Sequence, residues 1–195
     1  MKLLALLSSG IDSPVACYLM LKKGFEIEYL HFSNSKSTDK IKKIVRKLAE
    51  FGGTDRFFQM PHSEMMNRIL SLEFDRKYTC VMCKRSMLTL AELLANEIGC
   101  EALITGDNLG QVASQTISNI KVEEELIKMP VLRPLIGFDK VETVDIARKI
   151  GTYEISIEKE GSCRYVPRKP ATKAKKLPKI DIEILRKLEV KEIKV

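Results

Sequence analysis

The feature that most limits how this chain can fold is its start, where an apolar run stops abruptly at small polar residues. The stretch reads LLALLSSGIDSPVA, residues 3–16. Its apolar part predicts a buried strand, and Pro14 at a first helical position, with Ser13 as the cap, predicts that a helix follows. A helix start leaves backbone N–H groups without partners. The turn therefore predicts an anion site, with phosphate as the usual ligand.

Apolar runs and segments of helical period alternate along the chain up to about residue 160. We predict strands at Leu3–Leu7, Ile27–Phe32, Arg56–Met60, Ala102–Thr105 and Val131–Leu135. We predict helices at Pro14–Lys23, Asp39–Phe51, Glu64–Leu72, Cys83–Ile98, Lys140–Ile150 and Ile182–Leu188. This alternation indicates an α/β fold, a three-layer open parallel sheet with helices on both faces.

Polar clusters follow three of the predicted strands. They are SSGIDS after the first strand, His31–Asn34 after the second and TGDNLGQ after the fourth. Ligands of open parallel sheets bind outside the carboxyl ends of the strands. We therefore expect these clusters to meet at one site. Gly106 would let the backbone approach a ligand closely, and Arg133 and Lys140 would hold phosphates, although for each taken alone a turn glycine or a cation flanking a helix is the better interpretation.

Two cysteines, Cys80 and Cys83, open the predicted fourth helix in the sequence CVMCKRSM. Their place near a helix N-terminus, beside Lys84 and a following arginine, predicts lowered thiol pKa values. A structural zinc site requires four ligands, and Cys163 is the only further cysteine in a polar motif. Three thiolates suit an iron–sulfur cluster or a redox pair that serves a third sulfur. The other two cysteines, Cys17 and Cys100, are predicted to be core residues.

Positive charge is concentrated near the C-terminus. The stretch RYVPRKPATKAKKLPK, residues 164–179, holds seven basic residues and no acidic one, which equals the net charge of +7 of the whole chain. A strip of this kind predicts binding to a polyanion, and the alternative is a solvated tail. We divide the chain into residues 1–160, a nucleotide-binding domain, and residues 161–195, a basic extension. No apolar run is long enough to cross a membrane and MKLLALL lacks the features of a secretion signal, so we expect a cytoplasmic protein.

The turn SSGIDS resembles the pyrophosphate loop S-G-G-x-D-S of ATP pyrophosphatases that adenylate their substrates, with Ser9 in place of the first glycine. Together, SSGIDSPVA, CVMCKRSM, TGDNLGQVASQT, VLRPLIGFDK and CRYVPRKPATKAK resemble, in this order, the pyrophosphatase domain of tRNA 4-thiouridine synthetase, the ThiI family. The resemblance runs to about Lys176. It implies an adenine nucleotide alpha-hydrolase-like fold, also called the PP-loop ATP pyrophosphatase fold.

The resemblance implies an ATP-dependent sulfurtransferase in which the O4 oxygen of a tRNA uridine is adenylated and then replaced by sulfur. It assigns Ser8, Ser9, Gly10, Asp12 and Ser13 to the pyrophosphate, with Asp12 assisting Mg²⁺. Leu6, Leu7, His31 and Phe32 would border adenosine, and Lys84, Gly106 and Gln115 would complete the nucleotide pocket. Lys140 and Arg133 would stabilise phosphoryl transfer. Cys163 would handle sulfur, and Cys80, Cys83 and Cys163 would hold an iron–sulfur cluster of the archaeal type.

Members of the family usually carry an RNA-binding THUMP region before this domain, and some bacterial members add a rhodanese domain. Neither is present in these 195 residues. We therefore expect tRNA binding together with a separate THUMP-type RNA-binding protein, a sulfur donor that is sulfide or a persulfide protein, and a homodimer. Two alternatives stay open: an adenylating enzyme that acts on a small molecule, and a non-catalytic nucleotide-binding subunit in which Ser9 has cost activity.

Overall fold

The computed structural model of the chain describes residues 1–34, 38–110, 115–159, 161, 163–174, 177, 178, 183, 185 and 187–195. Three residues of the predicted helix at Ile182–Leu188 (182, 184 and 186) and part of the basic strip lie outside these residues. Among the helices that are described, none has the length and apolar character that crossing a membrane requires.

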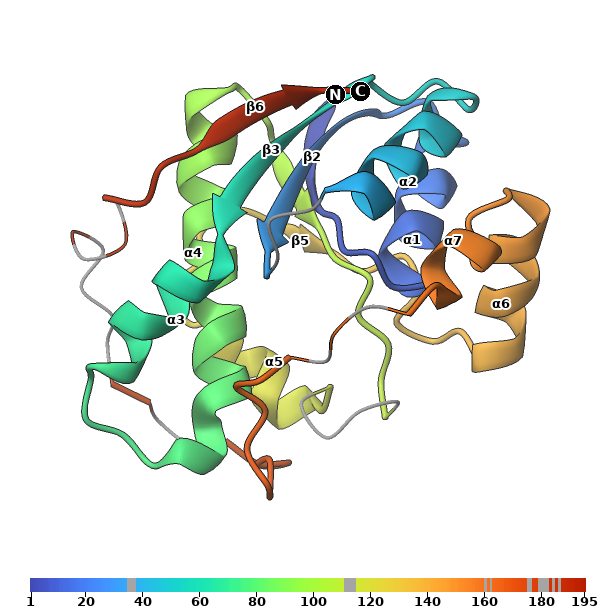
Figure 1. Ribbon diagram of the computed structural model, residues 1–195. Helices are drawn as coiled ribbons and strands as arrows, with labels where there is room; N and C mark the ends of the chain where they lie inside the picture. The colour runs from blue at the N-terminus through green and yellow to red at the C-terminus, as the bar shows by residue number, and fades with distance from the viewer. Residues whose placement is uncertain are drawn as a thin grey trace.

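A six-stranded sheet forms the centre of the molecule (Figure 1). Its strands are β1 (Lys2–Leu6), β2 (Glu26–Ser33), β3 (Arg56–Pro61), β4 (Ala102–Ile104), β5 (Val131–Leu132) and β6 (Lys191–Lys194), in the spatial order β5-β4-β1-β2-β3-β6. The first five strands are parallel, and β6 pairs antiparallel with β3. The predicted α/β fold with an open, largely parallel sheet is confirmed, and β6 adds an edge strand that the sequence pattern did not reveal.

Helices connect the strands. They are α1 (Asp12–Leu21), α2 (Asp39–Ala49), α3 (His62–Leu70), α4 (Thr79–Glu97), α5 (Ile117–Glu123), α6 (Lys140–Lys149) and α7 (Tyr153–Ile157), with the 3₁₀ helix η1 (Arg76–Tyr78) before α4. Figure 1 shows α1, α2, α6 and α7 to one side of the sheet and α3 and α4 to the other. The predicted helices on both faces are therefore present, and α5 and α7 are additions.

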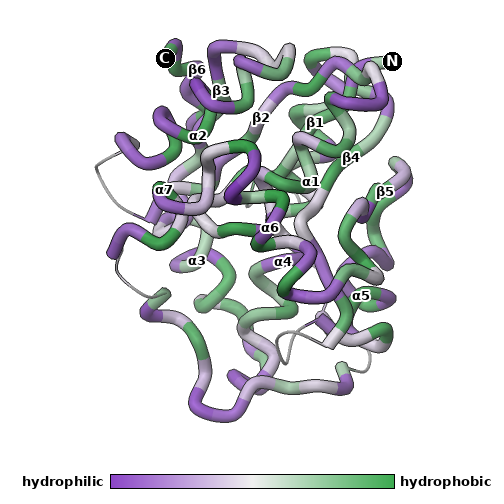
Figure 2. The backbone as a smooth tube through the Cα atoms, turned by 90° about the vertical axis from the view of Figure 1, so that its right-hand side faces the viewer, coloured by the Kyte–Doolittle hydropathy of each residue, from purple (hydrophilic) through white to green (hydrophobic). Residues whose placement is uncertain are grey.

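Successive side chains of the central strands point to opposite faces of the sheet, and this produces two separate hydrophobic cores. In β1, Leu3 and Ala5 face a cluster that includes α1 and α2, whereas Leu4 and Leu6 face a cluster that includes α3 and α4. A strand covered on both faces reads as a continuous apolar run, which is why KLLAL could be recognised as a strand. In Figure 2 the hydrophobic colour lies along β1 and α1 in the middle of the molecule.

The structure contradicts one prediction about local structure and confirms another. The predicted capping of the first helix by Ser13 is wrong, because α1 already begins at Asp12 and its N-cap, Ile11, makes no side-chain capping bond. The hydroxyl of Ser13 instead binds the preceding turn, as described below. Cys17 and Cys100 are buried, as predicted for core residues.

Candidate functional site

The turn after β1 is held by hydrogen bonds between Ser8 and Ser13. The backbone N–H of Ser8 donates to Ser13 Oγ at 2.8 Å, and the two hydroxyl oxygens lie 2.9 Å apart. The backbone N–H of Gly10 donates to Ser8 Oγ at 3.3 Å, and Ser156 Oγ, from α7, donates to the Gly10 carbonyl at the same distance. These bonds hold a tight turn against the start of α1. The free backbone N–H groups at the start of a helix favour a bound anion.

Serine in place of the first glycine does not strain this turn. Among the described residues, no residue other than glycine has a positive φ, so Ser9 takes an ordinary backbone conformation. The glycine of the family pattern is therefore not needed here for its left-handed freedom.

Gly106, directly after β4, packs against the start of α1. A Cβ atom at this position would lie 2.6 Å from the backbone nitrogen of Ser13 and 2.9 Å from the carbonyl carbon of Asp12. Backbone atoms cannot move aside as a flexible side chain can. Gly106 is therefore required by the close approach of β4 to the turn, which explains its place in the TGDNLGQ motif.

Lys140, the first residue of α6, contacts Asp12, the first residue of α1. Its Nζ lies 2.8 Å from Asp12 Oδ1, and both side chains are partly exposed to solvent. The capping box of Asp139 and Glu142 fixes the N-terminus of α6 and with it the origin of the lysine side chain. An ammonium group is thus held beside Asp12, the first residue of the helix that follows the turn.

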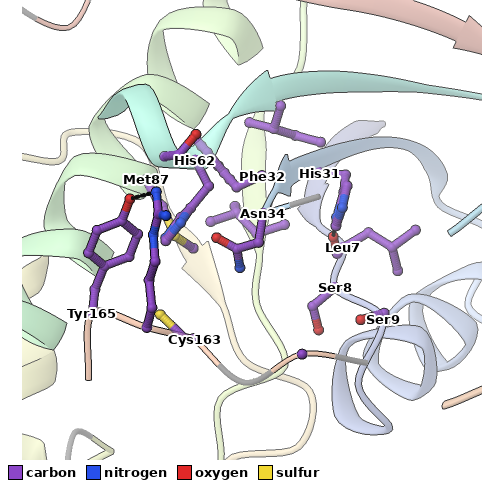
Figure 3. A pocket seen from close by; sticks show the side chains of 15 residues that line it. Leu7, Ser8, Ser9, His31, Phe32, Asn34, His62, Met87, Cys163 and Tyr165 are labelled. Atoms are coloured by element: carbon purple, nitrogen blue, oxygen red, sulfur yellow. Dashed lines mark hydrogen bonds between the residues drawn. The ribbon is translucent and has the colours of Figure 1, made fainter. Parts of the chain in front are cut away.

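A pocket of about 520 Å³ opens beside the turn (Figure 3). Part of its lining comes from the carboxyl ends of β1 and β2, namely Leu6, Leu7, Ser8, Ser9, Leu30, His31 and Phe32. The rest of the lining comes from other segments, namely Asn34, His62, Ser63, Met87, Gly161, Cys163, Arg164 and Tyr165. Figure 3 shows Ser8 and Ser9 at one end and Tyr165, His62 and Met87 at the other. The volume is typical of a small-molecule site.

Two of the predicted cations, Lys84 and Arg133, meet at a carboxylate that the sequence analysis did not select. Asp107 forms an ion pair with Lys84, and its other carboxylate oxygen accepts from Thr105 Oγ1 at 2.8 Å and from Arg133 Nε at 3.2 Å. Burial alone would raise the pKa of Asp107, but the charge and hydrogen bond of Lys84, with the help of Thr105 and Arg133, hold it below its ordinary value. Asp107 is therefore an ionised anchor that positions both cations.

Glu123, at the end of α5, is fully buried beside this group. Its Oε2 lies 4.0 Å from Lys84 Nζ, and neither carboxylate oxygen has a hydrogen-bond partner among the described residues. Burial raises the pKa of Glu123 to about 7, against the attraction of Lys84. This carboxyl group therefore changes charge near neutral pH.

We expect Glu123→Gln to stabilise the folded chain at pH 8 by about 1–3 kcal/mol and to have little effect at pH 4. A raised pKa means that the folded state binds the proton more tightly than the unfolded state does. The wild type therefore loses stability as the pH rises from about 4.3, the pKa of a glutamate in the unfolded chain, to about 7, the pKa of Glu123 in the folded chain. Urea unfolding at both pH values measures the difference. Glu101→Gln, at an exposed position, is the control. An equal effect of Glu123→Gln at both pH values would contradict the expectation.

The prediction of lowered thiol pKa values is wrong for the CxxC pair. Burial raises the pKa of both Cys80 and Cys83, and the nearby Cys163 raises them further. The expected cations act elsewhere: Lys84 pairs with Asp107, and Arg85, itself fully buried, donates to the Val122 carbonyl and to Glu125. In the absence of a bound group, desolvation therefore outweighs the helix N-terminus at these thiols.

The three predicted sulfur ligands share one neighbourhood but do not form a ready metal site. All five cysteines are free thiols, and Cys83 Sγ lies 3.2 Å from His62 Nε2. Cys163 is exposed and lines the pocket. In the part of the chain that the structure describes, no group of three His, Cys, Asp or Glu side chains is arranged to hold a metal ion.

The structure brings the predicted nucleotide residues together only in part. Leu6, Leu7, Ser8, Ser9, His31, Phe32 and Cys163 line the same pocket. The turn connects this pocket to Gly10, Asp12, Ser13, Gly106 and Lys140 through the contacts given above. Gln115 does not line the pocket, and its backbone carbonyl accepts from the N–H of Gly110. Residues 111–114 of the TGDNLGQVASQT motif lie outside the described residues.

Sequence reasoning missed four residues of this region. Asp107 stands inside the TGDNLGQ motif, so its charge was a usable signal. His62, one of only two histidines, directly follows the β3 strand. Tyr165 follows the CR pair of a quoted motif, but nothing in the sequence marks it as a pocket residue. Glu123 gives no signal, because only the packing of α5 buries it.

The described part of the basic strip is fixed to the body of the molecule. The buried Asn119 of α5 donates from Nδ2 to the Ala171 carbonyl at 2.9 Å and accepts at Oδ1 from the Ala174 N–H at 2.8 Å. The Ala171 N–H in turn donates to the carbonyl of Lys77, next to α4. Arg168, Lys169 and Lys173 remain exposed. The strip therefore leads outward from the pocket end at Arg164 with a fixed backbone and solvent-facing cations.

Comparison with known proteins gives consistent matches over nearly the whole chain. Residues 1–187 match the family model described as "Thiamine biosynthesis protein (ThiI)". The chain is 45% identical over 179 residues to a probable tRNA sulfurtransferase of Methanocaldococcus jannaschii, and these cover 89% of this chain and 47% of that protein. It is 43% identical over 199 residues to a probable tRNA sulfurtransferase of Methanothermobacter thermautotrophicus, covering 98% of this chain and 50% of that protein. The chain thus spans about half the length of the curated relatives it matches.

Among solved structures, a 4-thiouridine synthetase–RNA complex with bound ATP superposes with a TM-score of 0.86 at 38% identity, covering 99% of this chain and 55% of that chain. An NMN synthetase from Francisella tularensis superposes with a TM-score of 0.54 at 13% identity, covering 87% of this chain and 69% of that chain. The second match, at 13% identity, shows only that the two proteins share a fold.

Proposed function

The chain belongs to the ThiI family, and on that premise we propose that it acts as an ATP-dependent tRNA sulfurtransferase that converts a uridine to 4-thiouridine. One observation carries the proposal most directly. Ser8 and Ser9 of the SSGIDS turn line the same pocket as Cys163, which follows more than 150 residues later in the sequence. A site that adenylates an oxygen and then exchanges it for sulfur needs the two chemistries side by side.

The reaction divides into two displacements. The uridine O4 oxygen attacks the α-phosphorus of ATP, the bond from that phosphorus to the bridging oxygen breaks, and pyrophosphate leaves. Sulfide then attacks C4, the C4–O4 bond breaks, and AMP leaves with the oxygen while the sulfur loses its proton. The first step makes a poor leaving group into a good one, and fixed donors around the phosphates stabilise the charge that develops.

The residues of the turn are proposed to bind the phosphates of ATP. Ser8, Ser9, Gly10 and Ser13 would supply hydroxyl and backbone donors, and Lys140 would stabilise negative charge beside Asp12. Leu6, Leu7, His31 and Phe32 would border adenosine at the same pocket end. Lys84 and Arg133, positioned by Asp107, would approach the nucleotide from the β4 side, with Gly106 and Gln115 completing that side. Mg²⁺ commonly uses one carboxylate plus substrate phosphates, and the partly exposed Asp12 carboxylate fits this role.

An iron–sulfur cluster is a separate part of the proposal. The donor chemistry fits, because Cys80, Cys83 and Cys163 affect one another electrostatically and are the sulfur ligands such clusters prefer. Because the described residues include no group of three such side chains arranged to hold a metal ion, the three thiols would have to rearrange to bind the cluster. A bound cluster would supply an iron atom able to hold sulfide. Anaerobically purified protein is then expected to be brown, and replacement of any of the three cysteines is expected to bleach it.

The exposed cations of residues 164–173 are proposed to bind the tRNA backbone. Their backbone is already fixed by Asn119, so binding would cost little conformational entropy.

We further propose that a THUMP-type RNA-binding protein helps to place the tRNA and that sulfide or a persulfide protein donates sulfur. We also propose that the protein forms a homodimer and that it works in the cytoplasm. The division into residues 1–160 and 161–195 is retained as a proposal.

Incubation of the protein with ATP, Mg²⁺, sulfide and bulk tRNA tests the proposed function. We expect 4-thiouridine in the digested RNA, and none when ATP is omitted. Pyrophosphate release that ignores RNA and rises with a metabolite would favour the small-molecule enzyme. ATP binding without pyrophosphate release under any condition would favour the non-catalytic subunit.

A further inference from the structure

A group of charged side chains adjoins the phosphate turn without forming part of the pocket lining. Its centre is Asp107, which directly follows Gly106, the glycine that packs against the start of α1. Asp107 forms ion pairs with Lys84 and Arg133, and Arg133 also forms an ion pair with Glu124. Two positive and two negative charges therefore balance one another beside the turn.

Glu123, the last residue of α5, adds a charge that this balance does not include. Its side chain is fully buried, and its Oε2 lies 4.0 Å from Lys84 Nζ. Among the described residues, neither of its oxygens accepts a hydrogen bond. Asp107 differs, because it accepts from Lys84, Thr105 and Arg133. A buried carboxylate without such partners costs stability, and acidic groups in perturbed surroundings cluster at functional sites.

The titratable and charged groups that face Glu123 come from α4 and from the segments after β4, β5 and α5. They are Cys80, Cys83, Lys84, Arg85, Asp107, Glu124 and Arg133. Burial raises the pKa of both thiols, so they are uncharged at neutral pH. The charge of Arg85 is paired with Glu125. The remaining four groups are the balanced pairs around Asp107.

The charge of Glu123 therefore decides the net charge of the Asp107 group, which we define as Lys84, Asp107, Glu123, Glu124 and Arg133. Lys84 and Arg133 attract the negative charge of Glu123, whereas Asp107 and Glu124 repel it. The group is neutral when Glu123 is protonated and carries one net negative charge when Glu123 is ionised. A net negative charge beside the turn opposes the binding of phosphates.

We infer that Glu123 is a positioning residue of the nucleotide site, which holds the Lys84 ammonium between two carboxylates and limits the positive charge that Lys84 and Arg133 present to ATP. The inference rests on the proposed function, in which these two cations approach the nucleotide. It adds a residue that acts on ATP from outside the pocket lining. Since ATP binds better to the neutral group, binding of ATP draws a proton onto Glu123.

Glu123→Gln fixes the neutral form with nearly the same shape. Equilibrium binding of ATP with Mg²⁺ to the full chain is measured for both proteins at pH 6 and pH 8. The ratio of the two dissociation constants cancels the titration of ATP itself. We expect the ratio of wild type to variant to be near 1 at pH 6 and about 5 or more at pH 8, the lower end of the usual range for coupling between two sites. A ratio that is the same at both pH values would overturn the inference.

Glu97→Gln is the matched control, because it removes one negative charge from an exposed position on α4, the helix that carries Lys84. We expect its ratio to stay near 1 at both pH values. An equal rise for Glu97→Gln would reduce the effect of Glu123 to general surface charge and overturn the inference. A purely structural role of Glu123 would change ATP affinity equally at both pH values, so the pH profile separates positioning from packing.

Proton uptake provides a second measurement. Binding of ATP with Mg²⁺ is followed by calorimetry at pH 7.5 in two buffers of different ionisation enthalpy. We expect the wild type to take up part of a proton when ATP binds, and Glu123→Gln to lose this uptake. Equal proton exchange in the two proteins would contradict the role of Glu123.

The two proposals can fail separately. Wild-type protein that does not bind ATP would remove the proposed function and the role of Glu123 with it. Wild-type protein that binds ATP and thiolates tRNA, but has the same ATP affinity ratio to Glu123→Gln at both pH values, would leave the proposed function intact and remove only the role of Glu123.

Discussion

Replacement of Lys140 by alanine is expected to lower tRNA-dependent release of pyrophosphate by about 10²- to 10³-fold, the range found when one fixed donor to a developing charge is lost. The ammonium group lies 2.8 Å from Asp12 and is held at the N-terminus of α6 by a capping box. Because the charge that Lys140 opposes is larger in the transition state than in bound ATP, ATP affinity should change much less than the rate. Pyrophosphate release and equilibrium binding of ATP measure the two effects.

Lys149→Ala is the matched control for this prediction. Lys149 is an exposed lysine at the other end of the same helix, so its removal changes net charge and helix composition equally. We expect it to retain the wild-type rate. If Lys140→Ala weakened ATP binding and the rate to the same extent, Lys140 would contribute only to binding of the ground state.

Replacement of Cys163 by alanine is expected to abolish formation of 4-thiouridine while tRNA-dependent pyrophosphate release continues. Among the described residues, Cys163 is the one cysteine that lines the pocket together with Ser8 and Ser9. Figure 3 shows Cys163 on the side of Tyr165, apart from Ser8 and Ser9, so we expect adenylation not to depend on its thiol. Measuring pyrophosphate and thiolated nucleoside in the same reaction separates the two steps.

Cys100→Ala controls for the loss of a thiol, because Cys100 is buried in the core cluster away from the pocket lining. It is expected to keep both activities. Visible absorbance of the anaerobic protein adds an independent measurement of the proposed cluster. Full thiolation by Cys163→Ala would show that sulfur reaches the base by another route.

The first strand, the turn and the first helix could be predicted because their signals are local. A continuous apolar run, a stop at small polar residues and a proline near the helix start all lie within residues 3–16. The parallel direction of β1 to β5 could be predicted from the alternation of strands and helices along the chain. The strand β6 could not be predicted in this way, because KEIK has one apolar residue and pairs with β3, which is distant in the sequence.

The ion pairs of Asp107 with Lys84 and Arg133 are a part of the site that the sequence did not predict. Arg133 was selected as a phosphate ligand and Lys84 as a residue of the nucleotide pocket, but the residue that pairs with both, Asp107, comes from the segment after β4. The thiol pKa prediction was wrong for a related reason. It assumed that Lys84 and Arg85 act on the cysteines beside them, whereas tertiary packing directs Lys84 to Asp107 and Arg85 to α5 and Glu125. A local rule cannot account for the partners that packing provides.

The two edges of the sheet limit how copies of this protein can associate. At one edge β5 has only two residues, and at the other β6 carries the exposed charges of Lys191, Glu192 and Lys194. Very short and charged edge strands resist pairing with strands of other molecules. Growth of the sheet from one molecule into the next is therefore disfavoured, which protects against fibrous aggregation. A homodimer of the kind proposed above has to be assembled through helix surfaces or loops instead.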